Sequence, residues 1–134
     1  LLKTKLDSDQ QVYMSNINQS ANLLLDIIND ILDFSKIESG KFELSFEPVN
    51  LRSLAEQVID LFKSHALNKK IDLNLMIDPN IPKYVITDSV RLKQVLVNLI
   101  GNAVKFTNSG EVLLQIEIVK KNKKFDKFAS FLMC

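Results

Sequence analysis

The sequence predicts an α+β fold, in which a long N-terminal helix precedes a region of alternating strands and helices. Residues 9–38 contain no proline or glycine, and they carry a seam at alternating steps of four and three, which is typical of a long amphipathic helix. Three later stretches alternate apolar and polar residues with the period of two that is typical of strands. Two further stretches between these strands have the helical period. Together, these three observations define the fold class.

The first helix needs a packing partner. Burying one large apolar side chain stabilises a protein by roughly 1.5–3 kcal/mol, so leaving half a dozen in water forgoes on the order of ten kcal/mol. We therefore expect the seam to pack on other helices, with a plain core helix of a monomer as the alternative. The residues of the seam that we expect to pack are Tyr13, Ile17, Leu24, Ile27, Ile31 and Phe34. Gly40 is expected to end this helix.

The remaining elements follow in order along the chain. A strand is predicted over 42–46, closed by Pro48, and Asn50 is expected to cap a helix that runs to about residue 66. Further strands are predicted over 71–77 and 84–87, then a helix over 88–107 capped by Asp88, and a last strand over 112–118.

The helix over 88–107 carries two stripes. Its apolar stripe, which we expect to face the core, consists of Leu92, Val95, Leu96, Leu99, Ile100, Ala103 and Val104. Its polar stripe consists of Arg91, Gln94, Asn98, Asn102 and Lys105. Mg²⁺ prefers oxygen ligands and is usually held by one or two protein oxygens together with substrate phosphates, which suits Asn102. Lys105 could contact a phosphate and Phe106 could cover a nucleobase; the alternative is a solvated face without a ligand.

Two segments resemble a known family. The residues from Asn98 to Thr107 resemble the N-box of the ATP-binding domain of sensor histidine kinases, and those from Asp88 to Leu96 resemble the run that leads into it. Upstream, the residues from Ile27 to Gly40 resemble the end of the second helix of the dimerisation and phosphoacceptor hairpin, as found in hybrid kinases. The resemblance covers roughly residues 8–119.

The resemblance implies a domain organisation and a site. Residues 1–40 would be the second hairpin helix. Residues 41–119 would be part of a GHKL-type ATP-binding domain, with helices on one face of a mixed sheet. Residues 120–134 would be a basic tail. Asn102 would bind Mg²⁺, Asn98 would support it, Lys105 would contact phosphate and Phe106 would line the adenine site. ATP and Mg²⁺ are the implied cofactors. The implied partners are a second copy through the helical hairpin, a response-regulator receiver domain and the remainder of the kinase.

Two departures from the family bear on activity. The three glycines, Gly40, Gly101 and Gly110, form no Asp-x-Gly-x-Gly motif, and the only histidine, His65, lacks the setting of a phosphoacceptor. We therefore assign no catalytic residue and expect the chain alone to be inactive. One alternative is a non-catalytic dimerisation or interaction fragment. A second is a GHKL-type ATPase of another class, which is disfavoured because Asn98 occupies the position of the glutamate that activates water there.

Composition excludes few classes of protein but sets expectations about partners. Seventeen basic and sixteen acidic residues leave a net charge near +1, which gives no argument for binding nucleic acid or a membrane surface. No apolar run reaches the roughly 18 residues that span a bilayer. We expect this segment to be cytoplasmic, although the full-length kinase could be anchored in a membrane.

Overall fold

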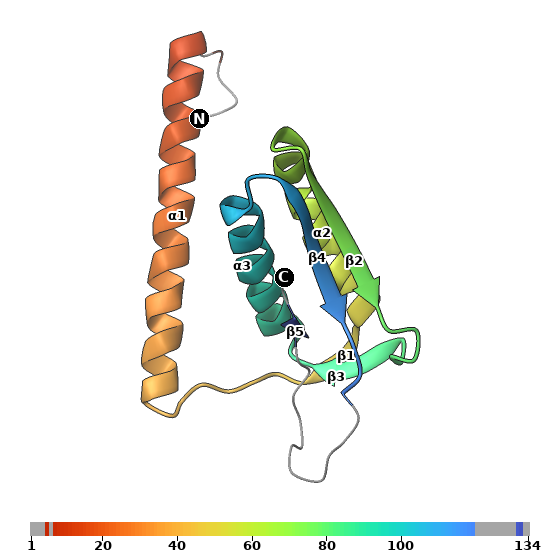
Figure 1. The fold of residues 1–134 in the computed structure, drawn as a ribbon. Helices are drawn as coiled ribbons and strands as arrows, with labels where there is room; N and C mark the ends of the chain where they lie inside the picture. Colours follow the sequence, from red (N-terminus) through yellow and green to blue (C-terminus); the bar gives the residue numbers. More distant parts are fainter. Residues whose placement is uncertain (1–4, 6, 120–130, 133–134) are drawn as a thin grey trace. The chain divides into compact units, whose positions relative to one another are not determined.

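The computed structural model describes residues 5, 7–119 and 131–132, and it has the predicted α+β fold (Figure 1). The chain divides into two compact units, Leu1–Glu43 and Leu44–Cys134. The first contains helix α1 (Ser8–Glu38). The second contains β1 (Glu47–Asn50), α2 (Leu51–Asn68), β2 (Ile71–Ile77), β3 (Tyr84–Thr87), α3 (Ser89–Phe106), β4 (Gly110–Ile116) and β5 (Phe131–Leu132).

Helix α1 begins and ends with local signals. The carboxylate of Asp7 accepts a hydrogen bond from the Gln10 amide at 2.8 Å, and the Gln10 side chain accepts one from the Asp7 amide at 3.2 Å, which forms a capping box. At the other end Gly40 has a φ of +68°, in the left-handed region that glycine adopts without strain. The prediction that Gly40 ends this helix is confirmed.

The prediction of a strand over 42–46 is wrong. Residues 41–46 have no regular structure, and β1 begins at Glu47 and includes Pro48. β1 pairs antiparallel with β3, Pro48 opposite Ile86, in a two-stranded ribbon where proline can occupy an edge. The alternation of Phe42, Leu44 and Phe46 does not suffice for a strand, because strand formation depends on a neighbouring strand and on burial; Phe46 remains 65% exposed.

The main sheet is mixed, with the order β2-β4-β5. β2 and β4 are parallel, with Ile71 opposite Gly110 and Ile77 opposite Ile116, and β5 is antiparallel to β4. The last strand was predicted over 112–118, whereas β4 begins at Gly110 and ends at Ile116. Parallel pairing along the full length of β2 sets these bounds, which a period of two alone does not reveal.

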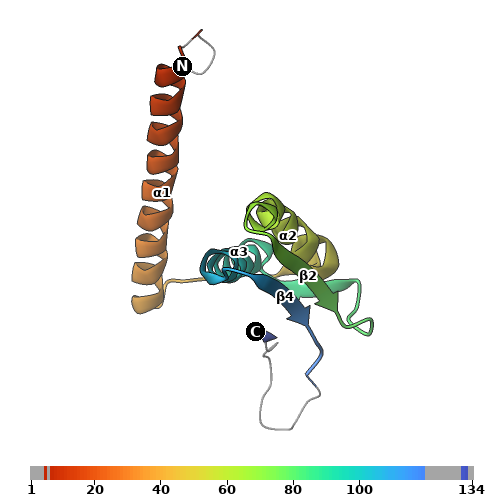
Figure 2. The ribbon, with the colours of Figure 1, turned by 45° about the horizontal axis from the view of Figure 1, so that its top comes forward.

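Helices α2 and α3 pack on one face of this sheet, as predicted (Figure 2). The layer between them is apolar and contains Val58, Ile59, Leu96, Ile100, Val104, Val112, Leu114 and Ile116, all at most 5% exposed. The core-facing stripe of α3 differs from the prediction at one position, because Val95 is 46% exposed while Val97 packs against the core. Gly101 lies where α2 and α3 meet, and a methyl group there would stand 3.3 Å from the Phe62 ring.

Candidate functional site

Helix α3 starts at a firmly bonded cap. The Asp88 side chain is 8% exposed and accepts hydrogen bonds from the Arg91 amide at 3.0 Å and the Ser45 amide at 2.9 Å. These two N–H groups stabilise the ionised carboxylate and so hold the pKa of Asp88 below its ordinary value of 3.8. The Arg91 amide makes the larger contribution. The predicted cap is confirmed, and its second bond also fixes the segment before β1.

Protonation of Asp88 in acid should therefore lower the stability of the second unit. A carboxylate whose pKa is lower in the folded state stabilises that state above its ordinary pKa, and this contribution is lost as the pH falls through the folded value. We expect Tm to decrease when the pH is lowered below about 4. In Asp88→Asn, which keeps a capping oxygen without the charge, Tm should be lower at pH 7 and should change less between pH 5 and pH 3. Thermal melts monitored by circular dichroism measure both effects.

The exposed Asp72 on β2 provides the control for this prediction. Asp72→Asn should keep the acid sensitivity of the wild type. An equal reduction of acid sensitivity in both variants would contradict the role assigned to Asp88.

The four predicted nucleotide-site residues lie at the C-terminal half of α3 and are all exposed. Asn98, Asn102 and Lys105 follow one another at steps of four and three, so their side chains share one face of the helix. The Lys105 ammonium lies 5.3 Å from the centre of the Phe106 ring. Neither carboxamide, of Asn98 or of Asn102, hydrogen-bonds to another residue in the described part of the chain. Both are therefore available to a ligand on this face.

The polar stripe divides into two halves. At the N-terminal half, a guanidinium nitrogen of Arg91 donates to the side-chain oxygen of Gln94 at 3.0 Å, and both residues are partly buried. At the C-terminal half the amide groups of Asn98 and Asn102 are unpaired within the described residues. Among the described residues, the unpaired carboxamides of the stripe therefore lie in this second half.

The described residues contain no cluster of three or more acidic, histidine or cysteine side chains that could hold a metal ion by themselves. Mg²⁺ usually keeps several waters and binds phosphate oxygens, so it needs few protein oxygens. Asn98 and Asn102 offer side-chain carboxamide oxygens on this face of α3.

A residue that sequence reasoning missed lies beside this face. The Lys69 ammonium donates hydrogen bonds to the carbonyl oxygens of Val104 at 2.7 Å and Lys105 at 2.9 Å. The two partners are separated from Lys69 by 35 and 36 positions in the sequence. No local pattern indicates such a contact, because it depends on how α2 and α3 pack.

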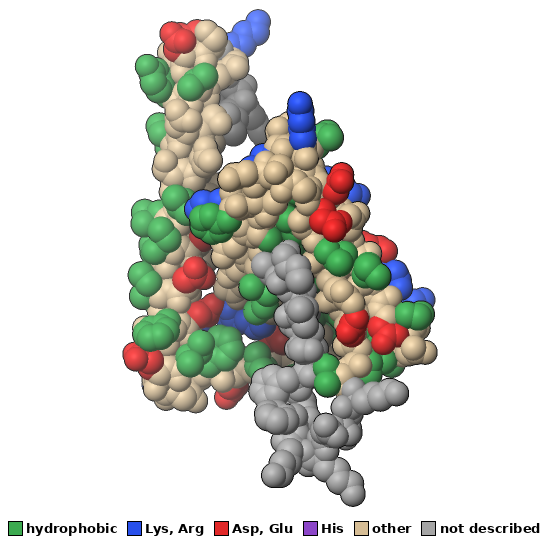
Figure 3. All heavy atoms as spheres, in the orientation of Figure 1, with side chains coloured by type: hydrophobic (Ala, Val, Ile, Leu, Met, Phe, Trp, Pro, Cys, Tyr) green, Lys and Arg blue, Asp and Glu red, His purple; other side chains and the backbone are tan. Residues whose placement is uncertain are grey.

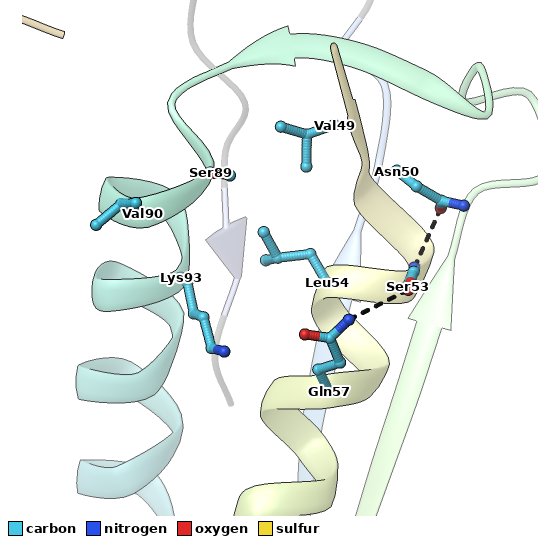
Figure 4. A pocket seen from close by; sticks show the side chains of 8 residues that line it. All are labelled: Val49, Asn50, Ser53, Leu54, Gln57, Ser89, Val90 and Lys93. Carbon is cyan, nitrogen blue, oxygen red and sulfur yellow. Dashed lines mark hydrogen bonds between the residues drawn. The ribbon is translucent and has the colours of Figure 1, made fainter. Parts of the chain in front are cut away.

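A separate pocket lies between the starts of α2 and α3 (Figure 4). It has a volume of about 390 Å³ and is lined by Val49, Asn50, Ser53, Leu54, Gln57, Ser89, Val90 and Lys93. The Asn50 side chain caps α2 by accepting a hydrogen bond from the Ser53 amide at 3.1 Å. None of the four predicted nucleotide-site residues lines this pocket. It is distinct from the face that carries Asn102.

The predicted packing residues of α1 are all exposed, and no side chain of this helix is buried. Their exposed fractions run from 47% for Ile27 to 67% for Tyr13. Figure 3 shows apolar side chains on the surface of α1. The further exposed apolar residues of the helix include Leu23, Leu25, Ile28, Leu32 and Ile37.

Comparison with known proteins assigns the family. Residues 1–40 match the His Kinase A (phospho-acceptor) domain. The chain is 44% identical over 116 residues to hybrid signal transduction histidine kinase E of Dictyostelium discoideum, a match that covers 87% of this chain and 7% of that protein. The chain belongs to the sensor histidine kinases. It corresponds to part of a hybrid sensor kinase and spans a small fraction of this relative's length.

Solved kinase structures have the same fold. Full-length ShkA in complex with AMPPNP is 36% identical to this kinase chain and superimposes with a TM-score of 0.71, covering 87% of this chain and 25% of ShkA. Histidine kinase ThkA in complex with the response regulator protein TrrA is 28% identical with a TM-score of 0.58, covering 87% of this chain and 34% of ThkA. The fold predicted for the kinase segment is thereby confirmed.

Among the helices of the described residues, none is both long and apolar enough to cross a membrane.

Proposed function

We propose that this chain supplies the magnesium-binding helix of a histidine kinase ATP site. The observation that carries the proposal is the pair of exposed carboxamides, of Asn98 and Asn102, on one face of α3 and without partners among the described residues. The relative ShkA was solved with AMPPNP, an ATP analogue. The proposed ligand of this face is therefore Mg-ATP.

Each residue has a distinct role in the proposal. The Asn102 carboxamide oxygen binds Mg²⁺, and Asn98, one turn earlier, contacts the metal-bound water or phosphate. The Lys105 ammonium pairs with a phosphate oxygen as a point charge, and the Phe106 ring covers the adenine. When bound, Mg²⁺ would neutralise phosphate charge, and phosphoryl transfer depends mainly on positioning and on such charge stabilisation.

The proposed activity of the kinase is transfer of the phosphoryl group of ATP to a histidine and signalling to a response regulator. His65, the only histidine in the chain, is exposed near the end of α2 and has no phosphoacceptor setting. We expect the chain alone to transfer no phosphoryl group, because neither an acceptor histidine nor an Asp-x-Gly-x-Gly motif is in the sequence.

The proposed partners follow from α1 and from the relatives. The match to the phospho-acceptor domain and the exposed apolar seam support a second copy of the chain as the partner of α1. The complex of ThkA with the response regulator TrrA supports a response-regulator receiver domain as the partner of the kinase.

Nucleotide binding tests the proposal. Titration of the chain with a fluorescent ATP analogue should give saturable binding that requires Mg²⁺. Asn102→Ala removes the proposed metal ligand and should raise the Kd of the analogue by about tenfold or more. A tenfold increase corresponds to a loss of about 1.4 kcal/mol of binding free energy. The matched control is Lys93→Ala, an exposed residue of the same helix that lines the separate pocket.

The control should bind like the wild type. Binding that does not depend on Mg²⁺, or equal weakening by both substitutions, would overturn the assignment of Asn102 as the metal ligand.

A further inference from the structure

Two side-chain hydrogen bonds join the end of α2 to the end of α3. Helix α2 ends at Asn68, and Lys69 directly follows as its C-terminal cap residue. The Lys69 ammonium donates to the carbonyl oxygens of Val104 at 2.7 Å and Lys105 at 2.9 Å, which belong to the last turn of α3. One side chain from α2 thus binds the end of the neighbouring helix.

These bonds satisfy groups that a helix cannot satisfy by itself. The last four carbonyls of an α-helix lack a partner within the helix, and they carry the negative end of its dipole. In α3 the Ala103 carbonyl accepts from the Thr107 amide at 3.0 Å. Lys69 supplies the donors for the next two carbonyls, and its positive charge lies where the dipole favours it.

The position of Lys69 is itself set by the backbone. Its amide donates to the His65 carbonyl at 3.2 Å, and the amide of Lys70 donates to the Leu67 carbonyl at 3.0 Å. Lys70 has a φ of +56°, so the chain turns sharply here before β2 begins at Ile71, which is 5% exposed. The lysine stem therefore starts from a fixed point between a helix and a buried strand.

We infer that Lys69 is a positioning residue for the nucleotide site, an inference that rests on the proposed function. The turn it binds carries Lys105 and Phe106, and it begins next to Asn102. By holding the carbonyls of Val104 and Lys105, Lys69 keeps this turn helical and so keeps the directions of the Asn102, Lys105 and Phe106 side chains fixed. Lys69 itself does not contact nucleotide.

The size of the effect follows from population arithmetic. If the last turn is helical in only a fraction of molecules, the apparent affinity equals the intrinsic affinity multiplied by that fraction. Lys69→Met keeps the length of the apolar stem without the donors, and we expect it to raise the Kd for Mg-AMPPNP by about three- to tenfold. Lys69→Arg keeps charge and donors and should restore the affinity to within about twofold of the wild type.

Two measurements on the full chain test the inference. Hydrogen exchange without nucleotide should be faster in Lys69→Met at the amides of residues 105–107, with little change at Leu96 and Ile100 in the middle of the helix. Titration with Mg-AMPPNP, at a temperature where every variant is folded, gives the affinities. Lys93→Met, on the exposed face of α3, is the matched control and should change neither quantity.

Each result bears on the inference. Faster exchange together with weaker binding, both rescued by arginine, would support it. Unchanged exchange in Lys69→Met, or faster exchange with unchanged affinity, would overturn it. If the wild type binds no Mg-AMPPNP, the proposed function fails and the positioning role fails with it, while exchange still reports whether Lys69 holds the helix end.

Discussion

Replacing Leu96 by alanine should strongly destabilise the second unit. Leu96 is 0% exposed and is among the largest fully buried side chains, together with Val58 and Ile100. Leucine-to-alanine substitutions at such sites cost about 3–5 kcal/mol, from lost transfer energy and from the cavity left behind. Domains of this size are stable by only about 5–15 kcal/mol, so the loss is a large fraction of the total.

Urea denaturation followed by circular dichroism measures this effect, with Val95→Ala as the control. Val95 is the adjacent residue of α3 but is 46% exposed. The control should cost less than about 1 kcal/mol. A similar loss for the two variants would contradict the placement of Leu96 in the layer between α2, α3 and the sheet.

The apolar seam of α1 should mediate self-association. Leu24 and Ile31 are 58% and 59% exposed and lie one heptad apart on the seam. Burying each would contribute roughly 1.5–3 kcal/mol, and a dimer buries it on both chains. We therefore expect the double variant Leu24→Glu and Ile31→Glu to raise the dimer dissociation constant by at least about 100-fold.

Sedimentation equilibrium measures this association. The matched control is Asn22→Glu together with Asn29→Glu, which adds the same charge two residues earlier in each heptad, on the polar side of the helix. The control should remain associated. A wild-type chain that is monomeric at tens of micromolar, or a control that dissociates equally, would exclude α1 as the contact between copies.

Local signals predicted most of the elements. The caps of α2 and α3 could be predicted from Asn50 and Asp88, since each side chain bonds an amide three residues ahead. The end of α1 could be predicted from Gly40 because left-handed backbone favours glycine. These features depend on neighbours within one turn of helix, and a single sequence contains them completely.

The predictions were wrong where the local structure depends on contacts with residues far away in the sequence. The strand predicted at 42–46 lacks a partner strand, while the Ser45 amide instead bonds the carboxylate of Asp88, 43 positions away. The contact of Lys69 with the end of α3 spans a similar separation. Val95, predicted to face the core, is 46% exposed, while Val97 packs against the core, because α3 packs on α2 as well as on the sheet. No local pattern contains these facts.

For the candidate site, the sequence predicted which side chains share a face, and the structure places them exposed on that face. What they bind stays a prediction, because ligand contacts need groups from outside one helix. The spacing of Asn98 and Asn102 gives a shared orientation, and their chemistry gives a preference for Mg²⁺ and phosphate.

Nuclear magnetic resonance of the side-chain amide groups tests the central claim most directly. In a spectrum of the ¹⁵N-labelled chain, Mg-ATP should shift the side-chain signals of Asn98 and Asn102 and the backbone signals of Lys105 and Phe106. ATP without Mg²⁺ should shift the two asparagine signals far less. Unchanged asparagine signals, or shifts confined to Ser53, Ser89 and Lys93 at the separate pocket, would contradict the proposal that α3 binds the nucleotide through its asparagines.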